Sequence, residues 1–121
     1  MNPVKFLAST PKVNLVLILV WMAAIFAGSA TPAKEIPPGV GSFSKVLHLA
    51  EYAMLGFLIY PYVSWRNMPL LLAAAVATVY GVSDELHQLF VPGRECDFFD
   101  ALTDCAGSII GAYASKIIGG R

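Results

Sequence analysis

The chain has little charge and almost no cysteine. Charged residues make up 13% of its 121 positions, about half of the usual fraction in a soluble domain, whereas 57% are hydrophobic. Eight basic and eight acidic residues would cover the surface of so small a soluble protein poorly. The formal net charge of zero gives no indication of nucleic acid as a partner. The composition therefore predicts an integral membrane protein of a single domain.

Cys96 and Cys105 are the only cysteines. If a helix joins them, its rise separates their Cα atoms by about 13 Å. That exceeds the roughly 7 Å over which a disulfide can form. We therefore expect two free thiols, and two such scattered cysteines give no support for a metal site.

Apolar runs divide the chain into four expected transmembrane helices. A spanning helix needs about 20 mostly apolar residues, and the expected spans are approximately residues 13–30, 46–65, 70–91 and 98–118. They belong to one domain, residues 1–121. Three prolines and two glycines between residues 31 and 44 indicate an exposed connection. The predicted fold class is all-α, an integral membrane four-helix bundle.

Proline and glycine mark the expected helix ends. Pro69 suits the start of the third helix, Pro92-Gly93 stops it, and Gly119-Gly120 ends the fourth. Within the fourth helix, Gly107 and Gly111 form a small-xxx-small pair, which predicts close contact with another helix.

The first apolar run permits a second interpretation. Residues 13–30 carry no charge and follow Lys5 and Lys12, and Gly28-Ser29-Ala30 resembles the small-residue site at which a secretory signal is cleaved. The run is also long enough to span a bilayer. The rest of the chain is apolar enough to stay in the membrane in either case.

The distribution of Lys and Arg predicts the orientation. With both termini on one side, five basic residues lie there and three on the other: Lys5, Lys12, Arg66, Lys116 and Arg121 against Lys34, Lys45 and Arg94. Because cytoplasmic loops carry the excess of basic residues, this favours a multi-pass protein of the cell membrane with both termini in the cytoplasm.

Polar residues gather at one end of the expected bundle, because successive helices run in opposite directions. They stand at the start of the second span, at and after the end of the third, and at the start of the fourth: Lys45, His48, Glu51 and Tyr52; Asp84, Glu85, His87, Gln88 and Arg94; Asp97, Asp100 and Asp104. Helical spacing places Lys45, His48 and Tyr52 on one face. A charge at mid-membrane costs about 2.5–3.5 kcal/mol. These groups are therefore expected to face one another, water or a ligand, which predicts a functional site.

Simpler roles are open for single members of the group. Asp97 and Asp100 suit the N-cap and first turn of a helix. Lys45 and Arg94 can extend to the lipid headgroups. Either histidine can make an ordinary hydrogen bond between helices, so the prediction of a site depends on the whole group.

These residues resemble the VanZ-like family. The similar segments lie within residues 43–113 and are Lys45-x-x-His48-x-x-x-Tyr52-x-x-Leu55-Gly56-Phe57, Ser83-Asp84-Glu85-Leu86-His87-Gln88-x-Phe90-Val91-Pro92-Gly93-Arg94 and Asp100-x-x-x-Asp104-x-x-Gly107. The resemblance implies a small, multi-span bacterial protein of the cell envelope. The founding member is linked to low-level resistance to the glycopeptide teicoplanin, and no settled biochemical activity comes with the family. The family usually has Asn where this chain has Asp104, which changes the local charge balance.

The expected site carries an excess of negative charge. Two cations, Lys45 and Arg94, stand against six acids, which leaves four unbalanced: Glu51, Asp84, Glu85, Asp97, Asp100 and Asp104. Carboxylates so crowded cannot all ionise without compensation. Either some are protonated, or a divalent metal or a cationic group binds. A divalent cation is thus a candidate cofactor without assigned ligands, and a carboxylate-rich set suits Mg²⁺, Ca²⁺ or Mn²⁺ better than zinc.

Two functions are open. In the first, the polar site alters glycopeptide susceptibility through a cell-surface lipid or cell-wall precursor, and the group is a buried hydrogen-bond network. In the second, the protein is a membrane-embedded, metal-assisted enzyme acting on a lipid or lipid-linked phosphate. The catalytic candidates are Asp84, Glu85, His87 and His48, and the substrate-binding candidates are Lys45, Tyr52, Gln88, Arg94, Asp100 and Asp104. A transporter is disfavoured, because polar groups at one end provide no path through the membrane. Membrane lipids are the expected partners, and the sequence leaves the oligomeric state open.

Overall fold

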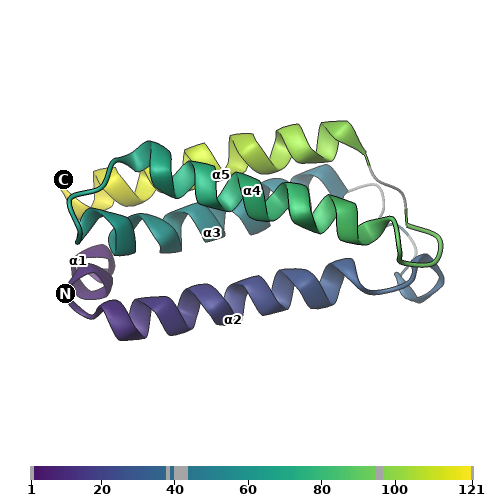
Figure 1. The fold of residues 1–121 in the computed structure, drawn as a ribbon, viewed down its shortest axis with the longest axis horizontal. Helices are drawn as coiled ribbons and strands as arrows, with labels where there is room; N and C mark the ends of the chain where they lie inside the picture. The colour runs from purple at the N-terminus through teal and green to yellow at the C-terminus, as the bar shows by residue number, and fades with distance from the viewer. Residues whose placement is uncertain (1, 38, 40–43, 95–96, 121) are drawn as a thin grey trace.

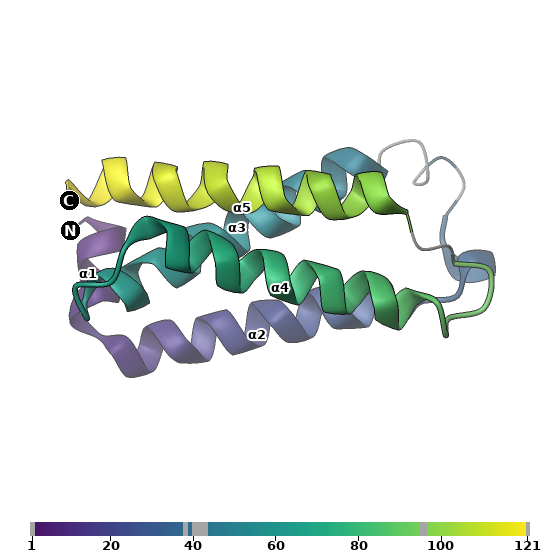
Figure 2. The same ribbon diagram turned by 45° about the horizontal axis from the view of Figure 1, so that its top comes forward.

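The computed structural model describes residues 2–37, 39, 44–94 and 97–120, which form a bundle of helices (Figures 1 and 2). Within this described part there are five α-helices, one short 3-10 helix and no strand. The α-helices are α1 (Pro3–Ser9), α2 (Pro11–Ser29), α3 (Ser44–Ser64), α4 (Leu70–Gln88) and α5 (Phe98–Gly119), and the 3-10 helix η1 is Ala33–Glu35. The two ends of the chain lie at the same end of the bundle (Figure 1). The all-α prediction is confirmed.

Three of these helices, α2, α3 and α4, are long and apolar enough to cross a membrane. The fourth long helix, α5, has 22 residues but carries Asp100 in its first turn, Asp104 soon after and Lys116 in its last turn. It is not among the candidate spans of the described residues. Membrane-spanning helices are thus supported, and the fourth span of the expected bundle stays a prediction.

The helix boundaries lie close to the expected ones. The largest difference is at the end of α4, where the helix stops at Gln88 and the predicted span ran to residue 91. Pro69 does precede α4. Gly93 and Gly120 adopt the left-handed backbone, with φ of 74° and 71°, which lets the chain turn after α4 and end α5. Of the two cysteines, Cys105 is a free thiol, and Cys96 lies outside the described residues.

Helix α1, which was not predicted from the sequence, lies at the end of the bundle where the chain begins and ends (Figure 1). Pro11 begins α2, and the non-helical backbone of Thr10 before it, with φ of −127° and ψ of 69°, separates α1 from α2. The Asn2 side chain caps α1 by accepting hydrogen bonds from the backbone of Val4 and Lys5. The Asn2 amide also donates to the Ile118 carbonyl at 2.6 Å. Helix α1 is thereby fixed to the end of α5.

The closest packing is between α3 and α5, which run in the same direction. A Cβ atom on Gly107 would lie 2.5 Å from the Leu49 carbonyl oxygen, and one on Gly111 would overlap the backbone of Ala53. The backbones of the two helices therefore touch, as the small-xxx-small pair predicts. This contact sets the start of α3 beside the start of α5, and so brings their polar residues together.

Helix α2 is attached to its neighbours by hydrogen bonds from side chains to backbone carbonyl groups, donated in both directions. Asn14 donates to the Leu58 carbonyl at 2.8 Å, and the Trp21 indole donates to the Glu51 carbonyl at 2.9 Å. In the other direction, the Tyr80 hydroxyl donates from α4 to the Met22 carbonyl at 2.6 Å. Such interhelical hydrogen bonds fix the rotation of an apolar helix about its own axis in a membrane.

Candidate functional site

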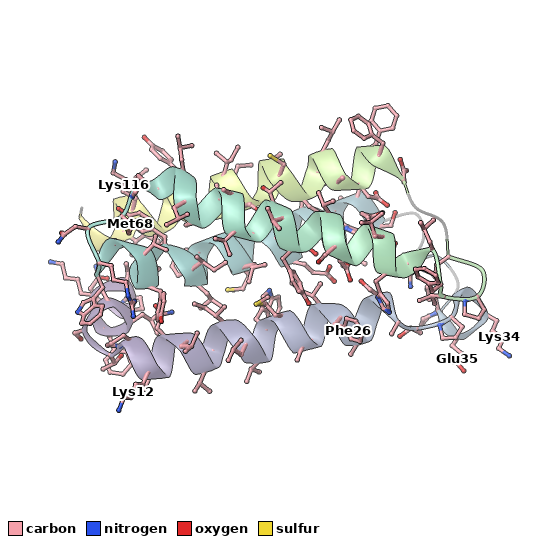
Figure 3. All side chains as sticks on the ribbon, viewed as in Figure 1. Lys12, Phe26, Lys34, Glu35, Met68 and Lys116 are labelled. Carbon is pink, nitrogen blue, oxygen red and sulfur yellow. The ribbon has the colours of Figure 1, made fainter. Side chains whose placement is uncertain are left out.

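The predicted polar residues do converge at one end of the bundle, where α3 and α5 begin and α4 ends. Figure 3 marks this end by Lys34 and Glu35 and the opposite end by Lys12, Met68 and Lys116. Seven members of the group have exposed fractions of 9% or less: His48, Tyr52, Asp84, Glu85, Gln88, Asp100 and Asp104. Burial of so many ionisable groups among apolar helices requires that each has a partner.

His48 and Asp104 form the most closely paired part of the site. The His48 Nδ1 donates to the Asp104 Oδ1 at 2.9 Å, from α3 to α5. The histidine is 7% exposed and the aspartate is fully buried. Because a carboxylate accepts at Nδ1, this nitrogen carries the proton in the neutral ring, which leaves the lone pair on Nε2. The imidazole is therefore held in one orientation, and its neutral form in one tautomer.

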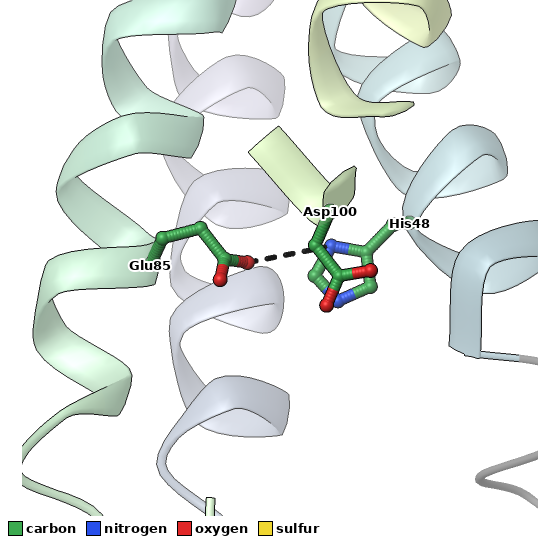
Figure 4. A group of neighbouring side chains, drawn as sticks. All are labelled: His48, Glu85 and Asp100. Atoms are coloured by element: carbon green, nitrogen blue, oxygen red, sulfur yellow. Dashed lines mark ion pairs between the residues drawn. The ribbon is translucent and has the colours of Figure 1, made fainter. Parts of the chain in front are cut away.

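Glu85 of α4 approaches this pair from the other side. One of its carboxylate oxygens, Oε1, lies 3.9 Å from the His48 Nδ1, and Oε2 accepts a hydrogen bond from the Asp97 backbone at 3.2 Å. His48, Glu85 and, from α5, Asp100 each offer one ligand atom, and the three atoms lie within 4.8 Å of one another (Figure 4). Three helices thus deliver one imidazole and two carboxylates to one point.

Lys45 and Asp97 lie at the outer rim of the site. The Lys45 Nζ pairs with Asp97 Oδ2 at 3.2 Å and with Asp100 Oδ1 at 3.3 Å. Asp97 also caps α5, because its side chain accepts from the Phe99 backbone at 2.9 Å. That hydrogen bond and the Lys45 ammonium hold the pKa of Asp97 below its usual value, so it is ionised at neutral pH. Asp97 therefore fills the capping role and also pairs with Lys45.

Asp84 and His87 face α2 instead. The Ser29 hydroxyl donates to Asp84 Oδ2, and the second Asp84 oxygen lies 4.0 Å from His87 Nδ1. The His87 ring stacks on Phe26, with 4.3 Å between ring centroids. The structure thus separates the two predicted histidines, and His87 is held against α2.

A pocket of about 370 Å³ opens between the end of α2, the start of α3 and the end of α4. The Arg94 Nη1 stands at its wall and donates to the carbonyls of Gly28 at 3.3 Å and Thr31 at 2.9 Å. The lining residues are Gly28, Ser29, Thr31, Glu35, Ile36, Pro37, Ser44, Leu47, His48, Glu51, Gln88 and Arg94. Three of the catalytic and substrate-binding candidates, His48, Gln88 and Arg94, therefore share one cavity with Glu51 of the expected site.

The sequence analysis missed the contribution of α2 and the segment after it. Ser29 had been considered only within the small-residue sequence of a cleavage site, yet it lines the pocket and donates to Asp84. Thr31 and Glu35 lie in the connection that was expected to be merely exposed. A possible signal was the position of Ser29 at the end of an apolar run, at the same depth as the other polar residues.

Several buried polar atoms of the site have no hydrogen-bond partner among the described residues. They are Tyr52 Oη, Asp84 Oδ1, Glu85 Oε1, His87 Nδ1, Gln88 Nε2 and Asp104 Oδ2. Tyr52 is fully buried with its ring stacked beside His48, with 6.5 Å between ring centroids. Buried polar groups in native proteins are almost always hydrogen-bonded to protein or water. So many unpartnered atoms in one place indicate a site that receives water, a proton or a ligand.

Comparison with known proteins identifies one family. The sequence matches the family described as VanZ/LLP1 over residues 8–119. This is nearly the whole chain and includes all the predicted site residues, so the resemblance found from the sequence is confirmed. Comparisons with curated proteins and with solved structures gave no match.

Proposed function

We propose that this chain, which belongs to the VanZ/LLP1 family, binds the phosphate-bearing headgroup of an envelope lipid or lipid-linked cell-wall precursor and acts on it by acid–base chemistry. The observation that carries this proposal is the His48–Asp104 pair, whose imidazole lines the same pocket as Arg94. A general base and an anion-binding group thus share one cavity at one end of membrane-spanning helices. A lipid headgroup is the substrate that lies at that depth.

Arg94 supports the binding step. Its Nη1 is fixed by two backbone carbonyls, and among the described residues its other N–H groups have no protein acceptor. A guanidinium held in this way keeps several donors for a phosphate, and it needs little further ordering when the ligand binds. Apolar lining residues, Ile36, Pro37 and Leu47, provide surface for the part of the lipid next to the headgroup.

The His48–Asp104 pair supports the chemical step. The Nε2 of His48 takes the proton of an attacking water as an O–P bond forms, and Asp104 stabilises the resulting imidazolium. The P–O bond to the leaving group then breaks, and the same proton passes from His48 to the leaving oxygen. The Gln88 amide, buried and without an acceptor for Nε2, is placed to donate to a charged phosphate oxygen.

The contacts between helices favour a second candidate function. The Ser29–Asp84 hydrogen bond joins α2 to α4, and the His48–Asp104 bond joins α3 to α5. A network of this kind can fix helix packing without chemistry. The protein would then bind a surface lipid or precursor and change glycopeptide access, including that of teicoplanin, by binding alone.

Lipid turnover in liposomes separates the two functions. Purified protein would be reconstituted with a defined phospholipid or a lipid-linked phosphate, and headgroup release followed by mass spectrometry. We expect release by the unsubstituted protein and a loss of about 10²-fold or more for His48→Gln, because general acid–base catalysis contributes about that much. Lys116→Gln, at the opposite end of α5, is the control and should release headgroup at the same rate. Absence of release with all these lipids, while they still bind, would reject the enzyme and favour the binding protein.

A further inference from the structure

We infer that His48, Glu85 and Asp100 form a divalent-cation site at the meeting of α3, α4 and α5 (Figure 4). Each side chain offers one ligand atom, and the three atoms lie within 4.8 Å of one another. Ligand atoms around one ion at bond lengths of about 2.1 Å are separated by roughly 3 to 4.2 Å. A small side-chain rotation is therefore enough to bring all three into coordination.

The Glu85 oxygen that accepts no hydrogen bond is an independent indication of a ligand, although it lies 3.9 Å from His48 Nδ1. The Glu85 side chain is 4% exposed, and its Oε1 has no hydrogen-bond partner among the described residues. Figure 4 shows this carboxylate pointing toward His48 and Asp100. Its other oxygen is fixed by the Asp97 backbone at 3.2 Å. A buried carboxylate oxygen without a donor is unfavourable, and a cation between it and Asp100 would compensate it.

Asp104 gives His48 the orientation that a metal ligand requires. Histidines that bind a metal through one ring nitrogen usually donate the other ring N–H to a carboxylate. The Nδ1 of His48 does so to Asp104 at 2.9 Å. Nε2 is therefore the coordinating nitrogen, and Asp104 is a positioning residue that does not touch the ion.

The protein's own cations leave room for an added one. Lys45 pairs with Asp100, but its side chain is 55% exposed and also pairs with Asp97 at the rim. Among the described residues, Lys45 is the only Lys or Arg that forms an ion pair with the acids of the site. An exposed ammonium held by solvent-screened pairs can move aside at little cost. The ion would then take one Asp100 oxygen together with Glu85 and His48.

The donor set favours a transition metal. One imidazole nitrogen with two carboxylate oxygens suits Mn²⁺ or Zn²⁺ better than Ca²⁺, which prefers oxygen ligands alone. This revises the preference drawn from the sequence, which rested on the number of carboxylates. The lone pair of Nε2 cannot bind an ion and take a proton from water at the same time, so a bound cation would exclude the acid–base step proposed for His48. Binding of the ion requires only the cluster and can therefore be tested without a lipid substrate.

Direct binding of Mn²⁺ to the full-length protein in detergent tests the site. The protein would first be stripped with a chelator and then titrated with Mn²⁺, with free ion measured by electron paramagnetic resonance. We expect saturable binding that Zn²⁺ displaces and Ca²⁺ does not. Glu85→Gln and Asp100→Asn should weaken it at least about tenfold and Asp104→Asn by about 10- to 100-fold. Glu35→Gln, an acid of the pocket outside the cluster, is the matched control and should bind as tightly as the unsubstituted protein.

Pulsed electron paramagnetic resonance on the unsubstituted protein gives a test that does not depend on whether the variants fold. Bound Mn²⁺ should show coupling to a histidine nitrogen, and His48→Gln should remove it. No saturable binding, no nitrogen coupling, or equal binding by a folded Glu85→Gln would overturn the inference. Because no lipid substrate is present, such a failure would leave the lipid proposal to be judged by turnover.

Discussion

Asp104 is a fully buried carboxylate with one oxygen bonded to His48 and the other without a partner. An isolated carboxylate in an apolar bundle is strongly disfavoured, so the hydrogen bond from His48 compensates part of the cost of burying Asp104. The same pairing fixes the neutral tautomer of His48 that leaves Nε2 available. The His48–Asp104 pair joins α3 to α5, places the imidazole at the pocket and orients it for the inferred cation.

Replacing Asp104 tests the pairing directly. Asp104→Ala should lower the free energy of unfolding by about 1–3 kcal/mol, because the buried N–H of His48 loses its acceptor. Asp104→Asn keeps an acceptor oxygen and should lose less. Unfolding by SDS titration in mixed micelles gives both values. Equal stability of the Ala variant and the unsubstituted protein would contradict the pairing.

Helices α3 and α5 are the elements that hold the site together. His48 and Asp104 face each other because the glycines of α5 let the two backbones touch. Without this close approach, the acids of α5 would lie farther from the imidazole of α3. The geometry of the site therefore depends on residues that carry no functional group.

Gly111→Ala tests this dependence. Its added Cβ would overlap the backbone of Ala53, so the helices must separate. We expect a loss of about 1–3 kcal/mol in unfolding free energy, as for overpacked cores, together with weakened binding at the site. Gly28→Ala is the control, since nothing lies within 4 Å of the added atom. Indistinguishable melting of the two variants would show that α3 and α5 are not in backbone contact.

The elements also show what the sequence could and could not predict. Long apolar runs gave α2 to α4 within a few residues, and antiparallel order gave the polar end. The side of α2 that faces the other helices was not predictable, because Ser29 and Trp21 donate hydrogen bonds to residues that are 55 and 30 positions away in the sequence. His87 was assigned to the site because it lies near the end of the third apolar run, at the same depth as the other polar residues. In the structure, Gln88 of α4 lines the pocket, whereas His87 stacks on Phe26 of α2.

At the scale of the whole molecule, the two ends differ in character. The polar end carries the site and exposed aromatic residues, Phe90, Phe98 and Phe99, whose exposed fractions are 64% or more. The opposite end carries Trp65, whose ring and that of Tyr62 lie under the Arg66 guanidinium. Aromatic side chains at both ends suit the two interfaces of a bilayer. This arrangement supports placing the pocket at headgroup depth.

The orientation in the membrane follows as a prediction. The basic residues favour both termini in the cytoplasm, which places the pocket on the outer side and requires α5 to span. In cells, Lys34→Cys should react with a membrane-impermeant maleimide, in a background with both native cysteines replaced by serine. Lys12→Cys should react only after permeabilisation. The reverse pattern would show that the protein has the opposite orientation. Labelling of both introduced cysteines in intact cells would contradict the four-span topology.

Cross-linking of a lipid headgroup is the most direct measurement of whether the pocket is a lipid site. A phospholipid with a photoreactive group on its headgroup would be incorporated with the protein in liposomes, and the linked peptides sequenced by mass spectrometry. We expect cross-links in residues 28–37 and 44–51 and around Arg94, reduced by unlabelled lipid and by Arg94→Gln. Cross-links confined to the end that carries Lys5 and Trp65, or spread evenly along α2 and unchanged by Arg94→Gln, would contradict a headgroup site in this pocket.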